Sequence, residues 1–227
     1  MNETPIFVTT PVWRVAYPDA HAGILVMHGV DNRAACPEMD RRRQEIENEL
    51  RARFAGQDRK ALSTIPTIQA YNAYYKQFNK TYHVQAQLES IAFKGRTIPS
   101  AGALVTAMFM AEVGNLLLTA GHDLDSLHLP VTLGVATGDE SYTLLRGQDQ
   151  VLKAGDMMMA DQAGVISSIV YGPDQRSQIR PHTRSVLYAV YAPAGIAVEA
   201  VRAHLQEICD YVRLGSPDAV VRMQEVI

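Results

Sequence analysis

The stretch Lys94–Leu127, KGRTIPSAGALVTAMFMAEVGNLLLTAGHDLDSL, decides how the rest of the chain is interpreted. Gly95 and Pro99 are strong helix breakers that come just before a long apolar run. The run predicts a helix that begins near Ser100 and ends by Gly121. A helix this apolar is expected to be buried on most sides, so it should form the centre of the core.

Asn115 is the polar residue that stands out within this run. It recurs at helical spacing with Leu104, Met108 and Ala111, so it shares a helix face with residues of the core. A buried amide must find hydrogen-bond partners. We therefore expect Asn115 to take part in a polar contact inside the molecule.

Length and composition indicate an ordinary globular chain. The 227 residues are 47% hydrophobic and 20% charged, which permits a sizeable core and does not resemble disorder. The net charge of −3 provides no global field that would attract nucleic acid, and we expect no DNA partner. No apolar run reaches about 18 residues, no signal peptide precedes the first elements, and two distant cysteines suit a reducing compartment. We expect a cytoplasmic protein without a membrane partner.

Strand-like and helix-like segments follow one another along the chain. Branched and aromatic runs predict strands over 12–17, 23–30, 131–136, 142–145, 157–160, 165–171 and 186–191. Helices are predicted over 37–56, 67–78, 84–93, 198–214 and, after Ser216-Pro217, over 218–227. This order favours an α+β fold with a mixed sheet flanked by helices, as one domain over 1–227 with C-terminal helices at 196–227.

Two features could indicate RNA binding, but each is also explained by an ordinary helix surface. Arg41, Arg42 and Arg43 form a basic run, but five arginines between 37 and 55 face five acids at helical pairing distance, which favours a solvated helix face. The tyrosines of 67–78 lie near Lys76 and could stack on unpaired bases, or could form the half-buried side of an amphipathic helix. Any RNA contact would have to come from such a local patch.

Several polar groups could carry chemistry, although each is also ordinary turn material. His122, Asp123 and Asp125 match no standard metal-ligand spacing, so turn or capping roles are favoured and no metal or cofactor is expected. Acids beside the predicted strand turns could meet at the mouth of a pocket: Asp139, Glu140, Asp149, Asp156 and Asp161. The turn Asp161, Gln162, Ala163, Gly164 joins two apolar strands, and His182 with Thr183 could supply a base and a hydroxyl.

Residues 71–195 resemble the editing domain of the phenylalanyl-tRNA synthetase β subunit, and more closely the free-standing proteins built from that domain. The resemblance rests on the order of its motifs: YKQFNKTYHVQAQLESIAFKG, RTIPSAGALVTAMFMAEVGNLLL, GHDLDSL, GDESYTLLRGQDQVL, GDMMMADQAGV and HTRSVLY. In the synthetase this domain hydrolyses the ester that links tyrosine to the wrong tRNA. The resemblance implies an α+β fold and a pocket large enough for an aminoacylated adenosine.

The resemblance also assigns candidate site residues. Asp149 takes the place of the family's pocket acid, where Glu is usual, and Asn115, Glu140 and the Asp161–Gly164 turn match family positions. His182, in the HTRSVLY motif, is a further candidate. Catalytic roles are predicted for Asp149, Asn115 and His182, and substrate contacts for Glu140, Asp161, Gln162, Ala163, Gly164 and Thr183.

Three functions remain open at this stage. The first is a trans-acting editing hydrolase that clears mischarged aminoacyl-tRNA, without being a complete ligase. The second is a non-catalytic module that binds an amino acid or a similar small molecule, and the third is an enzyme acting on another small amide or ester. A cluster of Arg41–Arg43, Arg51, Arg53, Arg59 and Lys60 beside the pocket mouth would favour the first, and a position on the opposite side would favour the second.

Overall fold

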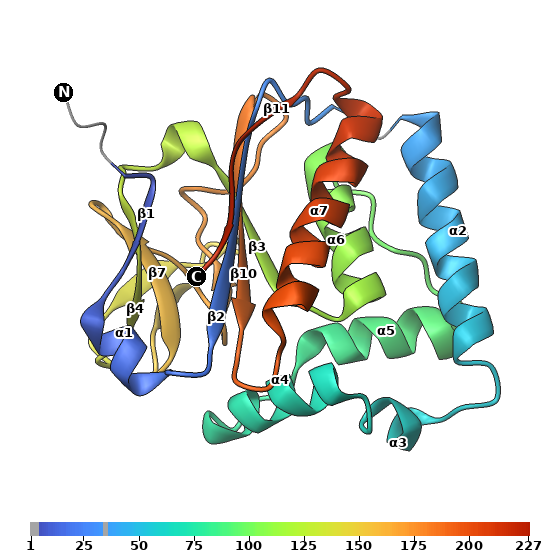
Figure 1. The fold of residues 1–227 in the computed structure, drawn as a ribbon, viewed down its shortest axis with the longest axis horizontal. Helices are drawn as coiled ribbons and strands as arrows, with labels where there is room; N and C mark the ends of the chain where they lie inside the picture. Colours follow the sequence, from blue (N-terminus) through green and yellow to red (C-terminus); the bar gives the residue numbers. More distant parts are fainter. Residues whose placement is uncertain (1–4, 34–35) are drawn as a thin grey trace.

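The computed structural model of the chain describes residues 5–33 and 36–227 (Figure 1). Its helices are α1 (Pro11–Ala16), α2 (Pro37–Arg53), α3 (Arg59–Leu62), α4 (Pro66–Gln77), α5 (His83–Lys94), α6 (Ala103–Asn115), the 3-10 turn η1 (Leu124–Ser126) and α7 (Val198–Gly215). Its strands are β1 (Phe7–Thr9), β2 (His21–His28), β3 (Thr119–Asp123), β4 (Val131–Val135), β5 (Ser141–Thr143), β6 (Asp149–Val151), β7 (Met157–Asp161), β8 (Gly164–Ser168), β9 (Gly172–Pro173), β10 (Ser185–Ala192) and β11 (Val220–Val226).

The strands of the described residues form two larger sheets and one hairpin. One sheet has the order β11-β2-β10-β3 and is antiparallel throughout. The other has the order β1-β4-β7-β8-β9 and is mixed, because β1 runs parallel to β4 while the other pairs are antiparallel. The strands β5 and β6 pair only with each other. The predicted α+β fold with a mixed sheet and flanking helices is confirmed.

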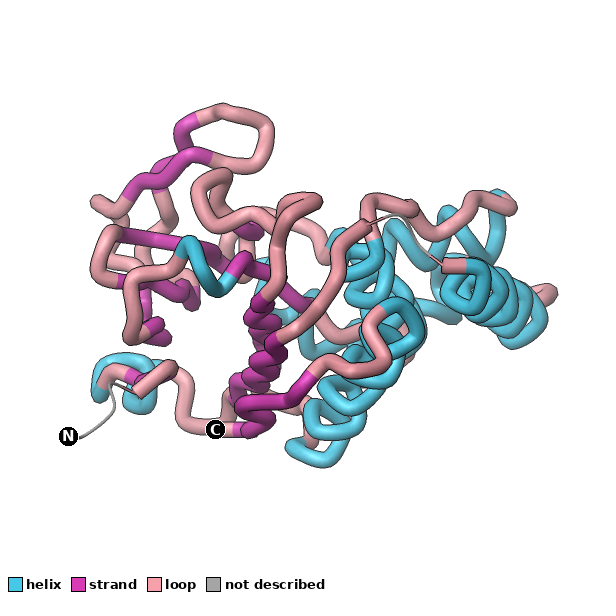
Figure 2. Tube along the Cα trace, turned by 90° about the horizontal axis from the view of Figure 1, so that it is seen from above, coloured by secondary structure: helices cyan, strands magenta, loops and turns pink. Residues whose placement is uncertain are grey.

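The β11-β2-β10-β3 sheet lies between the helices and the second sheet. Figures 1 and 2 show helices α2 to α7 gathered on one side of it, and the mixed sheet with α1 and the β5–β6 hairpin on the other. All eight residues of β10 are buried, as expected for a central strand covered on both faces. One hydrophobic cluster joins side chains of both larger sheets and the helices, so the site described below is built on a continuous core.

Two segments differ from the predicted elements. The segment 12–17, predicted as a strand, belongs to helix α1 (Pro11–Ala16) and its C-cap Tyr17, because the Thr10 hydroxyl accepts the Trp13 N–H at 3.1 Å and Pro11 starts the first turn. The predicted terminal helix over 218–227 is also wrong, since β11 pairs antiparallel with β2. The C-terminal region at 196–227 therefore contains one helix, α7, followed by an edge strand.

The central helix is shorter than the prediction. It ends at Asn115 because Leu116 adopts a left-handed conformation with φ of 62°. The apolar residues that follow continue into β3, which pairs with β10. Periodicity does not separate a short buried strand from a buried helix, which is why the sequence extended the helix to Gly121.

Four of the five arginines of α2 are paired with carboxylates of the same helix. Arg42 contacts Glu49 at 2.9 Å, Arg43 contacts Asp40 at 2.9 Å, and Arg51 reaches the carboxylate of its helix neighbour Glu47 at 3.2 Å. This confirms the ion pairing expected along the helix, and α2 lies on the outer side of the helical layer (Figure 1). In the described ranges, no helix is long and apolar enough to cross a membrane.

Candidate functional site

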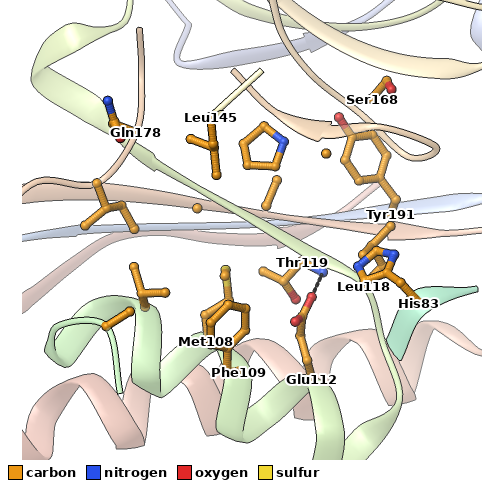
Figure 3. A pocket seen from close by; sticks show the side chains of 17 residues that line it. His83, Met108, Phe109, Glu112, Leu118, Thr119, Leu145, Ser168, Gln178 and Tyr191 are labelled. Carbon is orange, nitrogen blue, oxygen red and sulfur yellow. Dashed lines mark hydrogen bonds between the residues drawn. The ribbon is translucent and has the colours of Figure 1, made fainter. Parts of the chain in front are cut away.

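A cavity of about 310 Å³ lies between α6 and β3 and is closed on its other side by segments of the β5–β6 and β9–β10 loops (Figure 3). We call it the α6–β3 cavity. Its lining residues are His83, Ala101, Val105, Met108, Phe109, Glu112, Leu118, Thr119, Ala120, Gly121, Leu145, Ser168, Gly172, Pro173, Gln178, Ile179 and Tyr191. The volume is at the lower end of the roughly 300–1,000 Å³ usual for small-molecule sites. Apolar side chains predominate, with a few polar groups among them.

Glu112 is the acidic side chain of this cavity. It is 2% exposed, and its Oε1 accepts the backbone N–H of Thr119 at 2.8 Å. Figure 3 shows it reaching from α6 toward the cavity with one oxygen on that N–H. Burial raises the pKa of Glu112 from 4.5 to about 8, while the Thr119 N–H lowers it by a smaller amount. The carboxyl group is therefore mainly neutral at pH 7.

Thr119 connects the cavity to a buried polar network between α6 and α7. Its Oγ1 lies 2.7 Å from Nε2 of His204, which is fully buried. The other ring nitrogen of His204, Nδ1, lies 3.2 Å from Nδ2 of Asn115, and the same Nδ2 donates to Glu207. Burial lowers the pKa of His204 to about 3, so the imidazole is neutral.

Asn115 is thus partly buried and bonded inside the molecule, as its position on the helix predicted. It does not line the cavity. Its contacts reach the cavity through His204 and Thr119, so its predicted catalytic role stays a prediction while its geometry is that of a supporting residue.

The remaining polar lining residues lie around the opening and the far wall. His83 is exposed at the start of α5, and its Nδ1 lies 3.5 Å from the hydroxyl oxygen of Tyr75. Tyr191 is buried, and its hydroxyl is 2.7 Å from Oγ of Ser167. Gln178 is half-buried. The cavity therefore has an imidazole exposed to solvent and a neutral carboxyl group inside.

Three other predicted site residues lie away from this cavity. Asp149 is exposed on β6, where its carboxylate accepts the hydroxyl of Thr143 at 2.8 Å. Glu140 accepts the backbone N–H groups of Thr137 and Gly138, and these bonds hold its pKa below the usual value although burial raises it. His182 is exposed in the loop before β10. The structure does not bring Asp149, Asn115 and His182 together.

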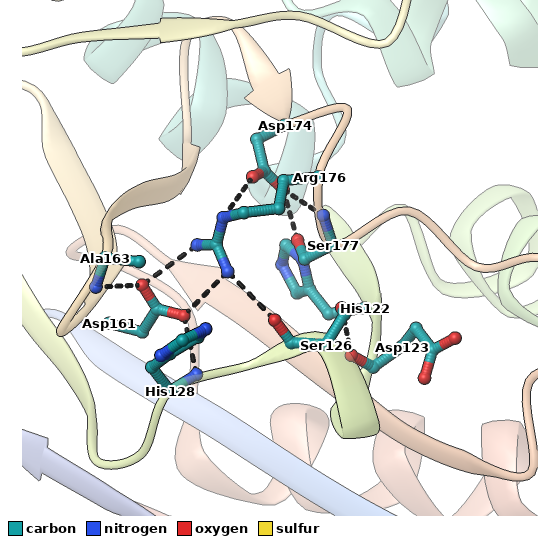
Figure 4. Close-up of polar contacts among 9 residues, drawn as sticks. All are labelled: His122, Asp123, Ser126, His128, Asp161, Ala163, Asp174, Arg176 and Ser177. Atoms are coloured by element: carbon teal, nitrogen blue, oxygen red, sulfur yellow. Dashed lines mark hydrogen bonds and ion pairs between the residues drawn. The ribbon is translucent and has the colours of Figure 1, made fainter.

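The turn Asp161–Gly164 is held by an ion pair (Figure 4). Arg176 donates to both carboxylate oxygens of Asp161, at 2.9 and 3.0 Å, and to the carbonyl of Ser126 at 2.9 Å. Asp161 also accepts the backbone N–H of His128 at 2.8 Å. Burial by itself would raise the pKa of Asp161, but these hydrogen bonds and the guanidinium hold it below its usual range. The ion pair fastens the β7–β8 turn to η1.

The other candidates of this region have local contacts. Gln162 donates to the carbonyl of Leu129 at 2.8 Å, while Ala163 and Gly164 line a separate, more open and polar cavity of about 510 Å³ together with Arg176 and Arg180. Thr183 is buried and donates its hydroxyl to Asp123 at 2.7 Å.

Asp123 also caps η1 by accepting the N–H of Asp125 at 3.2 Å, which confirms the capping role expected from the sequence. His122 is fully buried, and its Nδ1 lies 2.7 Å from Oγ of Ser177. Burial and, to a smaller degree, Arg176 lower the pKa of His122 to about 3. Within residues 5–33 and 36–227, no group of three or more His, Cys, Asp or Glu side chains could hold a metal ion.

Sequence reasoning missed Glu112, Thr119 and His204. Glu112 is the acid inside the apolar run 101–120, and an unpaired carboxyl in such a run is itself a signal for a functional site. Thr119 was assigned to the end of a helix, and His204 to a C-terminal helix outside the 71–195 region. Only the three-dimensional fold brings these residues into contact across α6, β3 and α7.

The basic residues that could guide RNA do not line the α6–β3 cavity. The helix α2 itself lies on the outer side of the helical layer (Figure 1), and Arg59 is paired with Glu89 at 3.0 Å. Arg59 and Lys60 border a different depression together with Tyr82 and Gln85. None of the basic residues named for this test therefore lines the α6–β3 cavity.

Comparison with known proteins gives a distant structural similarity. No family model matches this chain, and no curated protein matches its sequence. Among solved structures, the chain is similar to an N-terminal fragment of the phenylalanyl-tRNA synthetase β subunit from Pyrococcus horikoshii, with a TM-score of 0.49 and 10% sequence identity. The match covers 100% of this chain and 51% of that one, so the chain spans about half the length of the fragment. The relationship is a distant structural resemblance.

Proposed function

We propose that this protein is a binding module for an amino-acid-like small molecule, and that the ligand occupies the α6–β3 cavity. The observation that carries the proposal is a mainly apolar cavity of about 310 Å³ that contains a buried, neutral carboxyl group, Glu112. Small-molecule sites combine apolar walls with a few polar groups that fix orientation. Met108, Phe109 and Ile179 supply such walls, and Thr119 lies beside Glu112.

The arrangement of charge agrees with a small ligand. No Lys or Arg lines this cavity, and four of the five arginines of α2 have carboxylate partners on their own helix. A polyanion such as tRNA would need a basic surface near the opening.

Binding can be tested by narrowing the cavity at Gly121. A Cβ atom on Gly121 would come within 2.8 Å of the Ile179 side chain, which also lines the cavity. Gly121→Ala should therefore displace Ile179 in the cavity wall and weaken binding by about tenfold, the usual effect of one methyl group in a tight site. The matched control is Gly134→Ala in β4, where the nearest atoms lie 3.7 Å away at ordinary contact distance.

The measurement is isothermal titration calorimetry of wild type and both variants with a panel of amino acids, their methyl esters and their amides. We expect at least one ligand to bind wild type and the control alike and to bind Gly121→Ala less tightly. If no compound of the panel binds wild type, or if both variants bind as wild type does, the ligand site is not in this cavity.

A second candidate is hydrolysis of an aminoacyl ester, including clearance of mischarged tRNA in trans. The observation that favours it is an exposed imidazole, His83, at a cavity that also holds a neutral carboxyl group, Glu112. A pair of titratable groups in different environments can serve as base and acid in ester hydrolysis.

Deacylation of tRNA charged with a panel of wrong amino acids distinguishes the two functions. If the protein is a deacylase, His83→Ala and Glu112→Gln should reduce turnover, while Asp149→Ala, which changes an exposed residue outside the cavity, should not. A loss of turnover in Asp149→Ala alone would instead place the site at the β5–β6 hairpin. Absence of turnover by wild type, with binding in calorimetry, would leave the binding module.

A further inference from the structure

The network behind Thr119 fixes the direction of its hydrogen bonds. Glu207 presents a carboxylate oxygen to the side-chain amide of Asn115, and a carboxylate oxygen only accepts. The amide atom beside it must therefore be the nitrogen, Nδ2. The same Nδ2 lies 3.2 Å from Nδ1 of His204, so Nδ1 is the acceptor nitrogen of the neutral ring.

The donor and acceptor of the next hydrogen bond, between His204 and Thr119, follow from this assignment. Because Nδ1 accepts, Nε2 carries the hydrogen of the neutral imidazole and donates it to Oγ1 of Thr119 at 2.7 Å. The hydroxyl oxygen of Thr119 is then used as an acceptor, and its own O–H is left to donate. Among the described residues, no group other than His204 lies in hydrogen-bond contact with this hydroxyl, and Thr119 lines the cavity.

A similar argument shows which oxygen of the Glu112 carboxyl group carries the hydrogen. Its Oε1 accepts the Thr119 N–H, so in the neutral carboxyl group the hydrogen belongs on Oε2. Of the residues that the structure describes, none is in hydrogen-bond contact with Oε2, and no Lys or Arg faces the carboxyl group from the cavity lining. Oε2–H is thus a second donor beside the Thr119 hydroxyl.

We infer that Thr119 and Glu112 form a two-donor site for an uncharged carbonyl oxygen, such as that of an ester or amide, and that Asn115 and His204 are positioning residues that hold Thr119 in its donor state. The inference rests on the proposed function and narrows its ligand class. Two adjacent donors require an acceptor. An ionised carboxylate in this apolar cavity would lack a cation, which disfavours a free acid relative to its ester or amide.

Four probes that share a phenyl ring test the site: 2-phenylacetamide and methyl phenylacetate, which carry a carbonyl, phenylacetate, which is a free acid, and propylbenzene, which has no polar group. Calorimetry with wild type should give tighter binding for the amide and the ester than for the other two. Thr119→Val removes the donor at nearly equal volume and should weaken amide and ester binding by about three- to tenfold, the effect of one hydrogen bond. Propylbenzene binding should not change, and Thr119→Ser should retain the wild-type preference.

Asn115→Asp tests the positioning role, because it replaces a donor by an acceptor at almost the same size. His204 Nδ1 would then carry the hydrogen, Nε2 would accept from Thr119, and the hydroxyl would no longer donate to the ligand. We expect the same selective loss for the two carbonyl probes as in Thr119→Val. Nitrogen-15 NMR of wild type, which does not depend on any variant folding, should show His204 as the Nε2–H tautomer.

The outcomes separate the inference from the proposed function. If propylbenzene binds as tightly as the amide and Thr119→Val changes all probes equally, or if His204 is the Nδ1–H tautomer, the two-donor site is refuted while the cavity remains a ligand site. If none of the probes binds wild type and the amino-acid panel also fails, the proposed function itself fails.

Discussion

Replacement of Glu112 by Gln should make folding less sensitive to pH. The folded chain keeps the proton on Glu112 up to about pH 8, because burial disfavours the carboxylate, whereas the ordinary value is 4.5. The unfolded chain releases that proton near pH 4.5. Stability due to this group is therefore fully present below pH 4.5 and is lost as the pH rises toward 8. Gln cannot ionise, and its amide can accept the Thr119 N–H and donate to the cavity as the neutral acid does.

The size of the effect follows from the two pKa values. Their separation, at about 1.4 kcal/mol per pH unit, limits the loss to about 5 kcal/mol above pH 8. Between pH 4.5 and pH 7 the loss amounts to about 3 kcal/mol. The tyrosines that surround Glu112, namely Tyr71, Tyr75 and Tyr82, have pKa values raised by burial, so they stay neutral throughout this interval.

Urea unfolding at several pH values, followed by tryptophan fluorescence, measures this difference. Trp13 is the single tryptophan and is 2% exposed, so its emission reports unfolding. The free energy of unfolding of Glu112→Gln minus that of wild type should increase by about 3 kcal/mol from pH 4.5 to pH 7, and contributions from other groups cancel in this difference. A difference that stays flat would refute the buried neutral carboxyl group, and with it the polar part of the proposed cavity.

The other predictions concern contacts outside the cavity. Arg176→Met should lower the free energy of unfolding by about 2–3 kcal/mol, because Asp161 would keep a buried charge without its partner; urea unfolding checks this, and an unchanged midpoint would contradict it. Asp149→Ala should change stability by less than about 0.5 kcal/mol in the same assay, since the residue is exposed on the β5–β6 hairpin. Thr10→Ala removes the cap that accepts the Trp13 N–H and should cost about 1 kcal/mol, with Thr10→Ser as the variant that restores it.

The sequence was informative where its signals were long or repeated. The strands β2 and β10 and the helices α2, α4, α5 and α7 were predicted because branched runs and helical periodicity extend over six or more residues in each. The segment 12–17 failed because its branched and aromatic residues favour a strand, although Thr10 and Pro11 form a helix start. In this case the local cap, together with the fold around it, outweighed the propensity of the residues.

The candidate site was less accessible to sequence reasoning. Acids beside strand turns attracted attention, yet Glu140 and Asp161 are bound by backbone N–H groups that stabilise their own turns. The residues that form the polar end of the cavity, Glu112, Thr119 and His204, come from elements that are not adjacent in the sequence. Their assembly depends on α7 packing against α6, which no spacing along the chain indicates.

The pairing of β2 with β10 has a consequence for synthesis of the chain. His28 lies opposite Ser185 and His21 opposite Ala192. The strand β2 therefore cannot pair with its neighbour β10 until more than 150 further residues have been made. At about 5–20 residues per second, this delay lasts roughly 8 to 30 seconds. During that time the nascent chain exposes an eight-residue, nearly fully apolar strand. Ribosome-associated chaperones are therefore expected to hold this strand until β10 emerges.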